Sequence, residues 1–328
     1  MKCFIMKLEG SVTNNSLPKI GELRYLIKKT SDVRNIFLFD GVADKAVTST
    51  VSGKNYFTDV NGTVNNGKSI SRKTTQDANR YFKSLEDGYY TISQKYDIGR
   101  ILIRDYKDME IDISDFSYCK NLTSFTVSNS SVSGNIASLN SLVNLTTLSI
   151  GSSSVSGNIA SLNSLVNLTT LSIGNSSVSG NIASLNSLVN LTTLSIGSSS
   201  VSGNIASLNS LVNLTTLKIN NFSVSGNIAS LNSLVNLTTL SINNSSVSGD
   251  IASLNSLVNL TELNVSNSKV NGDCKNLFDG LVTAGKRNGI LKILTINKEV
   301  SYNGEKPTKR VWSATFNNGS YSVENTDN

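Results

Sequence analysis

The sequence predicts a mostly β protein: a solenoid of stacked repeats, with a separate β-rich N-terminal domain and a C-terminal cap made of one helix and a β-hairpin. Two observations predict the solenoid. Val-Ser-Gly, or once Val-Asn-Gly, recurs every 23 residues from Val132 to Val270, and a fixed period of this length is typical of stacked structural units. Within each period the aliphatic residues occupy the same places, so successive copies can share one core.

Each repeat is expected to contain a short strand followed by corners. Leu148 and Ile150 are two residues apart, which predicts a strand that turns both side chains inward. The remaining aliphatic residues of this copy mark the corners of the coil; they are Leu142, Leu145, Val155, Ile159 and Leu162. One copy alone cannot bury enough apolar surface to offset the conformational entropy of ordering it, so the copies must stack.

The spacing L-x2-L-x2-L-x-I resembles that of leucine-rich repeats, and "LSIGSSSVSGNI" (residues 148–159) is similar to the variant found in plant receptors. The resemblance covers roughly residues 96–296, and it implies a parallel sheet whose outer face binds a partner. One position departs from the family pattern, because the asparagine that usually follows the strand is absent. The position is occupied by Ser153, Ser176, Ser199, Phe222, Ser245 and Ser268. We expect the serine hydroxyls among them to bond the turn backbone instead.

Composition predicts three domains, namely residues 1–95, 96–273 and 274–328. From residue 132 to 260 the only charges are Lys218 and Asp250, and Phe222 is the only aromatic residue of the near-identical copies. Residues 1–95 hold far more charged and aromatic residues, and we interpret them as a separate β-rich domain. Four stretches there are predicted strands, and residues 16–29 form either a strand or a short helix; the four are 2–10, 35–41, 55–60 and 88–93.

Both ends of the solenoid are predicted to be capped. In the N-terminal cap repeat, Met109, Ile111, Ile113 and Phe116 stand at repeat positions. At the other end, Leu277, Leu281 and Val282 have helical spacing, and "ILKILTI" (residues 290–296) indicates a final strand. "KRVWSATFNNGSYSVEN" (residues 309–325) places Asn-Asn-Gly between two alternating runs, which is a hairpin signal.

Several functions are disfavoured by the sequence. The net charge of +6 is dispersed, and no patch of basic and aromatic residues suggests nucleic-acid binding. Neither a secretory signal nor a membrane-spanning stretch is found, so no membrane insertion is expected. "GTVNNGKS" (residues 62–69) satisfies the phosphate-loop pattern but lacks the apolar strand before it and the helix after it. We interpret it as a hairpin turn.

No cofactor, metal site or enzymatic activity is predicted. The chain has no histidine and three widely separated cysteines. Cys119 aligns with Leu142 of the repeat and Cys274 with Ile251, so both are expected to be buried free thiols. The asparagines of the repeated Asn-Leu-Thr are expected at corners, bonding the turn backbone; they are Asn121, Asn144, Asn167, Asn190, Asn213, Asn236 and Asn259.

The candidate ligand-facing residues are those that vary at or just after the strands, where they are expected to face outward on a concave sheet. They are Ser149, Ser172, Ser195, Lys218, Asn220, Phe222, Ser241 and Asn264. The alternative interpretation is drift at positions that tolerate change. The surface is mostly Thr, Ser, Gly and Asn, with almost none of the Tyr, Trp or Arg that anchor interfaces, which favours a rigid spacer.

The short V-S-G-x-I repeats and "GLVTAGKRNGILKILTINKEVSYNG" (residues 280–304) also resemble leucine-rich-repeat proteins of gut Bacteroides-type bacteria and their tailed phages. This resemblance implies a non-enzymatic virion protein. Its N-terminal domain would dock to other virion proteins, and its solenoid would project as a spacer or as a surface for a host cell-surface protein or glycan. The alternative is a bacterial interaction or adhesion protein, in the cytoplasm or at the cell surface.

Overall fold

The computed structural model describes residues 112–117, 119–284, 289–294, 300–306 and 308–326, together with the strands of residues 1–110. Two compact units are present. One contains residues 1–157 and 175–177, and the other contains residues 158–174 and 178–328. Most of the near-identical repeats belong to the second unit.

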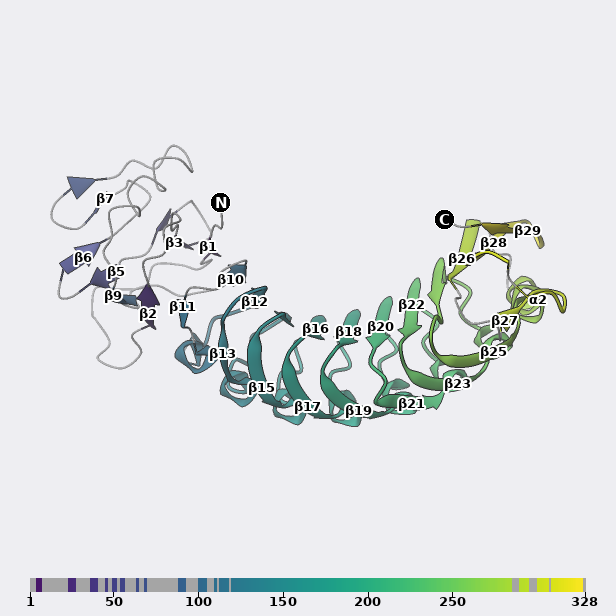
Figure 1. Ribbon diagram of the computed structural model, residues 1–328, viewed down its shortest axis with the longest axis horizontal. Helices are drawn as coiled ribbons and strands as arrows, with labels where there is room; N and C mark the ends of the chain where they lie inside the picture. The colour runs from purple at the N-terminus through teal and green to yellow at the C-terminus, as the bar shows by residue number, and fades with distance from the viewer. Residues whose placement is uncertain are drawn as a thin grey trace. The chain divides into compact units, whose positions relative to one another are not determined.

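In the second unit the strands predicted from the leucine pattern form a parallel sheet in register. Leu194 lies opposite Leu217, and Ile196 lies opposite Ile219, so equivalent residues of successive repeats lie side by side. The strands of this sheet are β16 (Thr170–Gly174), β18 (Thr193–Gly197), β20 (Thr216–Asn220), β22 (Thr239–Asn243), β24 (Glu262–Asn264) and β26 (Gly289–Leu294). Within this unit the sheet runs along the inner side of the bend made by the repeats (Figure 1).

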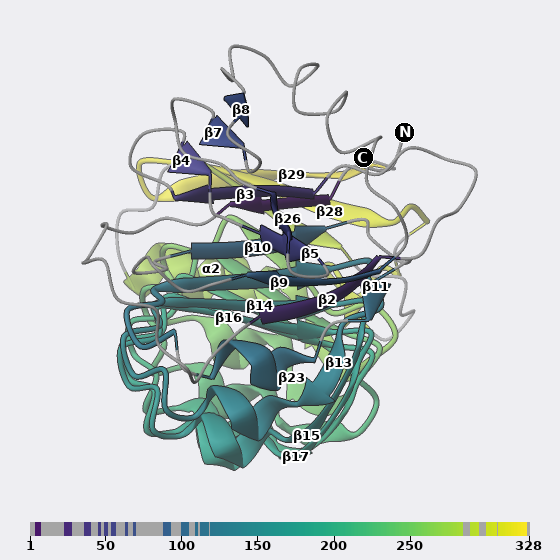
Figure 2. The same ribbon diagram turned by 90° about the vertical axis from the view of Figure 1, so that its left-hand side faces the viewer.

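Each repeat also contains a second short strand and a single turn of 3-10 helix. For the residues after the first strand, the sequence predicted only corners of the coil. The second strands are β17 (Ser177–Asn181), β19 (Ser200–Asn204), β21 (Val224–Asn227), β23 (Ser246–Asp250), β25 (Lys269–Asp273) and β27 (Val300–Ser301). In the end-on view, β16 and β17 lie on different sides of the same turn (Figure 2).

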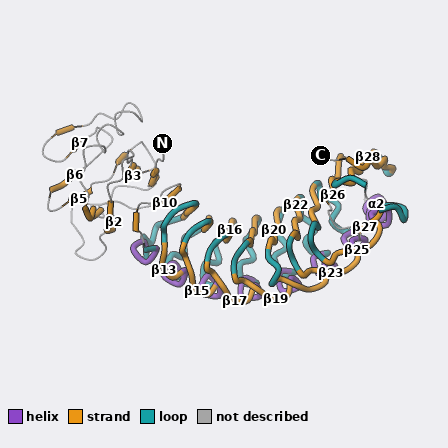
Figure 3. Tube along the Cα trace, viewed as in Figure 1, coloured by secondary structure: helices purple, strands orange, loops and turns teal. Residues whose placement is uncertain are grey.

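The 3-10 helices follow the second strands along the outer side of the coil (Figure 3). They are η3 (Ile159–Leu162), η4 (Ile182–Leu185), η5 (Ile205–Leu208), η6 (Ile228–Leu231) and η7 (Ile251–Leu254). Each helix buries its first and last residue, because the side chains of residues three apart in a 3-10 helix lie on the same face.

All seven aliphatic positions predicted for one repeat are fully buried in the core. In the copy that begins at Leu142, every one of these side chains is 0% exposed. The repeat therefore has three inward-facing edges, supplied by the strand, the second strand and the 3-10 helix. The aliphatic side chains of one repeat are covered by stacking, because the neighbouring repeats on both sides pack against them.

The first unit begins the same parallel arrangement with longer and more varied side chains. β10 (Arg100–Arg104), β12 (Ser124–Ser128) and β14 (Thr147–Gly151) pair in parallel. The second strands are β13 (Ser133–Asn135) and β15 (Ser154–Asn158), and the 3-10 helices are η1 (Ile113–Phe116) and η2 (Ile136–Leu139).

The predicted N-terminal cap repeat is present in part. Ile113 and Phe116 are fully buried, as expected, and Phe116 packs against Phe125 with ring centroids 5.2 Å apart. Met109 instead lies in β11 (Met109–Glu110), which pairs antiparallel with β2 (Leu23–Ile27). Met109 therefore belongs to a sheet of the N-terminal region and not to the repeat. Ile111 lies outside the described residues.

Each stretch predicted as a strand in residues 1–95 contains a described strand, although residues 55–60 do so only at Asn55 and Tyr56, and the described part of residues 16–29 is a strand. β1 (Phe4–Lys7), β3 (Ile36–Asp40) and β4 (Lys45–Ala46) form one sheet. A second sheet contains β11, β2, β9 (Gly88–Ile92), β5 (Ser49–Val51) and β6 (Lys54–Tyr56). The proposed boundaries at 95/96 and 273/274 remain predictions.

The C-terminal cap contains the predicted elements. α2 (Cys274–Ala284) follows β25, and β28 (Val311–Asn317) and β29 (Ser320–Thr326) extend the first sheet in antiparallel fashion. The hairpin loop is Asn318-Gly319, with φ of 47° and 87°, which is the left-handed pair that a tight two-residue loop requires. The Phe278 ring contacts Tyr302, Phe316 and Tyr321, so the core of the cap combines an aromatic cluster with buried aliphatic side chains such as Leu277 and Leu281.

No helix in the described segments has both the length and the apolar character needed to cross a lipid bilayer.

Candidate functional site

The face of the parallel sheet that points away from the aliphatic core carries most of the residues proposed from sequence. Alternating burial along the strands turns Leu and Ile inward and the intervening residues outward, so these residues share one face. Lys218 is exposed and lies between Ser195 and Ser241 of the neighbouring strands. Ser149, Ser172, Ser195 and Asn264 are half-buried, whereas Ser241 is buried.

Phe222 lies beyond this sheet. β20 ends at Asn220, which is exposed, and Phe222 stands in the turn between β20 and β21 with 66% of its surface exposed. The residue between them, Asn221, is buried. Phe222 was predicted to face outward on the concave sheet, whereas it lies in the turn after β20.

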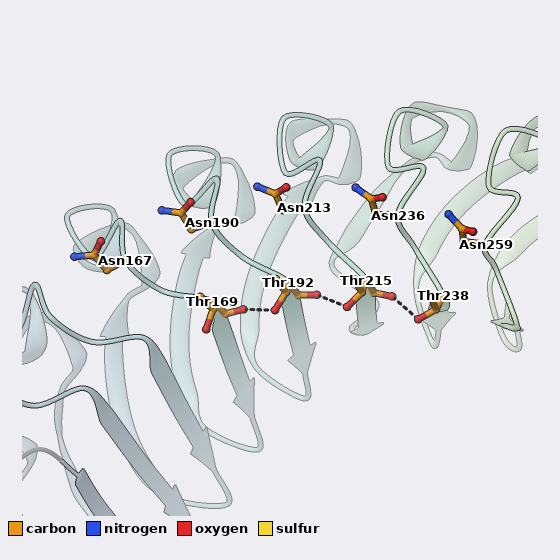
Figure 4. A pocket seen from close by; sticks show the side chains of 9 residues that line it. All are labelled: Asn167, Thr169, Asn190, Thr192, Asn213, Thr215, Asn236, Thr238 and Asn259. Atoms are coloured by element: carbon orange, nitrogen blue, oxygen red, sulfur yellow. Dashed lines mark hydrogen bonds between the residues drawn. The ribbon is translucent and has the colours of Figure 1, made fainter. Parts of the chain in front are cut away.

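A polar groove runs along the opposite edge of the same sheet, where the Asn-Leu-Thr segments lie. It is lined by Asn167, Thr169, Asn190, Thr192, Asn213, Thr215, Asn236, Thr238 and Asn259. In Figure 4 the amides of successive asparagines have the same orientation, each with its nitrogen toward the preceding repeat. The groove offers amide and hydroxyl groups and no charge.

The groove side chains are hydrogen-bonded to the backbone of the preceding repeat. Nδ2 of Asn213 donates to the carbonyl oxygen of Val189 at 2.9 Å, and Oγ1 of Thr215 donates to that of Thr192 at 3.1 Å. The sequence analysis expected each asparagine to bond turn backbone, and it does so, but across 24 residues rather than locally. The main role of these groove side chains is therefore to join successive repeats through a ladder of hydrogen bonds.

A second asparagine of each repeat has a structural role that the sequence analysis missed. Oδ1 of Asn181 accepts a hydrogen bond from the backbone nitrogen of Ala183 at 2.9 Å and caps η4. Asn158, Asn204 and Asn227 do the same for their helices, and Asp250 does so for η7. The available signal was an Asn or Asp at a fixed place directly before Ile-Ala-Ser-Leu, which matches the preference of helix N-caps.

The serine that replaces the family's asparagine bonds the turn backbone in some repeats only. Oγ of Ser245 donates to the carbonyl oxygen of Ile242 at 3.3 Å, and Oγ of Ser268 donates to that of Val265 at 2.6 Å. The hydroxyls of Ser153 and Ser176 are buried without a partner among the described residues.

The described residues hold no cluster of side chains suited to binding a metal ion. In the segments that the structure covers, no three His, Cys, Asp or Glu side chains come together. Cys119 and Cys274 are buried, as predicted, and burial raises the pKa of the Cys274 thiol far above its ordinary value. Lys68 and Ser69 form β8, which pairs antiparallel with β7 (Thr63–Val64). This pairing agrees with a hairpin rather than a phosphate loop.

Carboxylates of the C-terminal cap are engaged in structural contacts. Asp273 caps α2 by accepting from the backbone nitrogen of Lys275 at 2.8 Å, and it also accepts from those of Asn303 and Gly304. Asp279 accepts from the Tyr321 hydroxyl at 2.7 Å and pairs with Lys275 at 2.5 Å. These hydrogen bonds lower the pKa of Asp279, with the bond from Lys275 as the largest cause.

Coils of this kind, with an in-register parallel sheet on one side and short helices on the other, are known in solved structures. The fold is that of a leucine-rich-repeat solenoid. The plant peptide hormone receptor RGFR1, solved in complex with RGF2, is 25% identical over 58% of this chain and 30% of its own, with a TM-score of 0.49. The chain thus spans less than a third of that receptor's length.

Two bacterial structures are also similar to this leucine-rich-repeat chain. Internalin C2 from Listeria monocytogenes is 23% identical over 52% of this chain and 72% of its own, with a TM-score of 0.42. A leucine-rich-repeat protein of Leptospira interrogans is 19% identical over 59% of this chain and 52% of its own, with a TM-score of 0.45. No protein-family model matches the sequence, and no curated protein is significantly similar to it. These likenesses concern the fold.

Proposed function

We propose that this chain is a non-enzymatic structural and recognition protein, associated with a virion, whose solenoid projects as a rigid spacer that carries a binding surface. The observation that carries the spacer role is the repetition of identical contacts. The carbonyl oxygen of Thr192 accepts from the backbone nitrogens of Thr215 and Thr216 at 2.9 and 3.1 Å and from Oγ1 of Thr215 at 3.1 Å. The carbonyl oxygen of Thr215 accepts the same three bonds from the next repeat.

Such a ladder makes the repeats interchangeable, because each one presents the same donors, acceptors and aliphatic side chains to its neighbours. A solenoid of this kind behaves as a one-dimensional array in which stability is a sum over repeats and interfaces. Its length can change without a change of register. A polar surface almost free of charge suits a spacer that must not adhere along its whole length.

Association with a virion is supported by the resemblance of the repeats and of residues 280–304 to proteins of gut bacteria and their tailed phages. In this proposal residues 1–95 dock to other virion proteins, and the solenoid faces a host cell-surface protein or glycan. The alternative is a bacterial leucine-rich-repeat interaction protein at or near the cell surface. The fold suits either role, since both need a rigid surface that presents residues from several repeats.

Mass spectrometry of purified particles tests the virion association directly. The proposal requires this chain to co-purify with capsid and tail proteins through a density gradient. If the chain is present in the infected or host cell but absent from the particles, the virion proposal fails and the cellular alternative stands.

Removal of one repeat tests the spacer role. Deletion of Val178–Ser200 removes one period, and we expect the fold to persist with the sheet shortened by about 4.8 Å. Binding of the protein or particle to host cells should be retained. Loss of binding on this deletion, with the far-ultraviolet circular dichroism of a folded solenoid retained, would show that the removed repeat is part of a specific surface.

A further inference from the structure

The turn that follows β20 differs from the corresponding turns of other repeats. In those turns, the residue after the strand's last residue has a left-handed conformation, with φ of 46° at Asn175, 39° at Ser198 and 47° at Asn244. The next residue is a serine with a buried hydroxyl or side chain, as at Ser176 and Ser245. This is the turn that the repeated sequence encodes.

Asn221 takes over the inward position in the repeat of β20, and it does not have the left-handed conformation. Its side chain is 6% exposed. Nδ2 donates to the carbonyl oxygens of Ser199 at 3.0 Å and Val201 at 2.9 Å, and Oδ1 accepts from the backbone nitrogen of Ser223 at 2.9 Å. A buried amide whose donor and acceptor are both used holds the surrounding backbone firmly, so this turn has its own stable conformation.

Phe222 is turned outward as a consequence. It aligns with Ser199 and Ser245, but a benzyl side chain does not fit a space that holds a serine. A single exposed apolar residue is common on protein surfaces; here, however, the turn is rebuilt beneath it by a buried amide, and Oγ of Ser246 donates to the Phe222 carbonyl oxygen at 2.8 Å. An aromatic side chain on an ordered backbone is the kind of residue that supplies much of the energy at a protein interface.

The same repeat carries a cation. Lys218 is exposed on β20, and it is the only charged residue from residue 132 to residue 249. The positions that flank it across the sheet are Ser195 and Ser241. One repeat therefore combines an exposed aromatic ring and an isolated positive charge within a neutral, polar surface.

We propose that the segment from Lys218 to Phe222 is a docking site for an acidic protein segment, one that packs apolar side chains around Phe222 and places a carboxylate near Lys218. An opposite charge on the partner is favoured because the residues that flank Lys218 across the sheet, Ser195 and Ser241, are uncharged, and charge complementarity sets orientation and partner choice at interfaces. The inference rests on the proposal that the chain is a recognition protein, and it does not depend on association with a virion.

The test uses the full chain and a displayed library of random peptides. Selection should enrich peptides that carry Leu, Phe or Trp next to Asp or Glu, and binding of synthetic copies is then measured by fluorescence anisotropy. The informative variant is the triple substitution Asn220→Gly, Asn221→Ser and Phe222→Ser, which restores the turn sequence of the other repeats and should therefore fold. We expect it to weaken binding by about 30-fold or more, the loss typical of a hot-spot residue.

Charge substitutions separate the role of Lys218 from a general effect of basic residues. Lys218→Ser should weaken binding by about 5-fold and reduce its dependence on salt. Lys292→Ser is the matched control, because Lys292 is also exposed and belongs to β26 of the same sheet. It should leave peptide affinity unchanged.

Four results would overturn the proposal: selection that enriches no peptide, enriched peptides without acidic residues, equal binding by the triple variant, and Phe222-dependent binding to phosphatidylglycerol vesicles in place of peptides. The last would assign the site to a membrane surface. Failure of the virion proposal is distinguishable, because a chain absent from particles can still bind acidic peptides through Phe222.

Discussion

Oδ1 of Asn181 occupies the space that a Cβ atom at Gly203 would need. Asn181 belongs to one repeat and Gly203 to the next, so the glycine lets the following strand lie directly over the amide that caps η4. Gly203 also has a φ of 121°, which side chains other than that of glycine rarely tolerate. The same relationship joins Asn158 to Gly180 and Asn204 to Gly226.

Gly203→Ala is therefore expected to lower the free energy of unfolding by about 2–4 kcal/mol, from backbone strain and overlap with Asn181 combined. Urea denaturation followed by circular dichroism measures this. Gly197→Ala is the control in the same repeat. Its new Cβ would meet the nearest atom, Cβ of Asn220, at 3.6 Å, so the change should be within about 0.5 kcal/mol.

The partner of the clash can be identified by a double-mutant cycle. Asn181→Ala removes the cap and should cost about 1 kcal/mol. If the amide is what excludes a Cβ atom, Gly203→Ala combined with Asn181→Ala should cost at least about 0.5 kcal/mol less than the sum of the single changes. Simple additivity would mean that the backbone conformation alone requires the glycine.

Asn221 is expected to stabilise the protein only as long as Phe222 is present. Asn221→Ser alone removes the hydrogen bonds of a buried amide and should lower the free energy of unfolding by about 1–3 kcal/mol. The triple reversion of Asn220, Asn221 and Phe222 restores the common turn and should lie within about 0.5 kcal/mol of the natural chain. Thermal unfolding of the two variants side by side decides the matter, and equal losses would contradict the rebuilt-turn interpretation.

Cys119 and Cys274 should react slowly with a thiol reagent in the native protein. Both are buried, and the raised pKa of Cys274 keeps its thiol protonated. In a Cys3→Ser background we expect labelling by an aromatic disulfide to be at least about 100-fold slower than in urea, since reaction requires local opening. Rapid labelling of either residue would place it at the surface.

The C-terminal cap should lose stability in acid through Asp273. Burial by itself raises the pKa of this carboxyl, but hydrogen bonds from the backbone of Gly304, Lys275 and Asn303 and from the Ser301 hydroxyl outweigh it, so the pKa lies below the ordinary value of 3.8. A carboxyl with a lowered folded pKa stabilises the fold above the unfolded pKa, and this stability is lost as pH falls through the folded value.

Trp312 reports this transition, because it is the only tryptophan of the chain and lies in the cap at 7% exposure. Its fluorescence should change below pH 3.8 as Asp273 takes up a proton. Asp273→Asn should destabilise the cap at pH 7 by about 1 kcal/mol, since the carboxylate is only half-buried, and should flatten the acid transition. An unchanged acid transition in the variant would assign the effect to other carboxyl groups.

Lys68→Ala should leave any binding or assembly function intact, because Lys68 lies in a short antiparallel hairpin strand. Equilibrium dialysis with ATP should show no binding that the substitution abolishes. Lys68-dependent ATP binding would instead restore the phosphate-loop interpretation of residues 62–69.

The 23-residue period predicted the parallel sheet well, because repeats of nearly the same sequence adopt the same conformation and stack in register. Leu148 and Ile150 are inward-facing strand residues, and the aliphatic residues around them are all buried. The hairpin at Asn318-Gly319 was equally accessible, since its left-handed pair is encoded locally. The second strands and 3-10 helices were not predicted, because Val155 and Ile159 are too widely spaced to show a period of their own.

Contacts between repeats could not be predicted from the sequence of a single repeat. The bond from Asn213 to Val189 and the fit of Gly203 over Asn181 join residues that are more than 20 positions apart, and each looks like a local turn signal in its own copy. The outward orientation of Phe222 also depends on Asn221 reaching the backbone of the preceding repeat.

The sequence by itself determined the solenoid, its 23-residue period, its aliphatic core and the two-part C-terminal cap, because burial pattern and turn chemistry are properties of the residues in order. The tertiary structure alone decided which polar residues join the repeats and which face the solvent. The physical reason is that an amide or hydroxyl has several partners within reach of its own copy, and only stacking brings the neighbouring backbone close enough to select one.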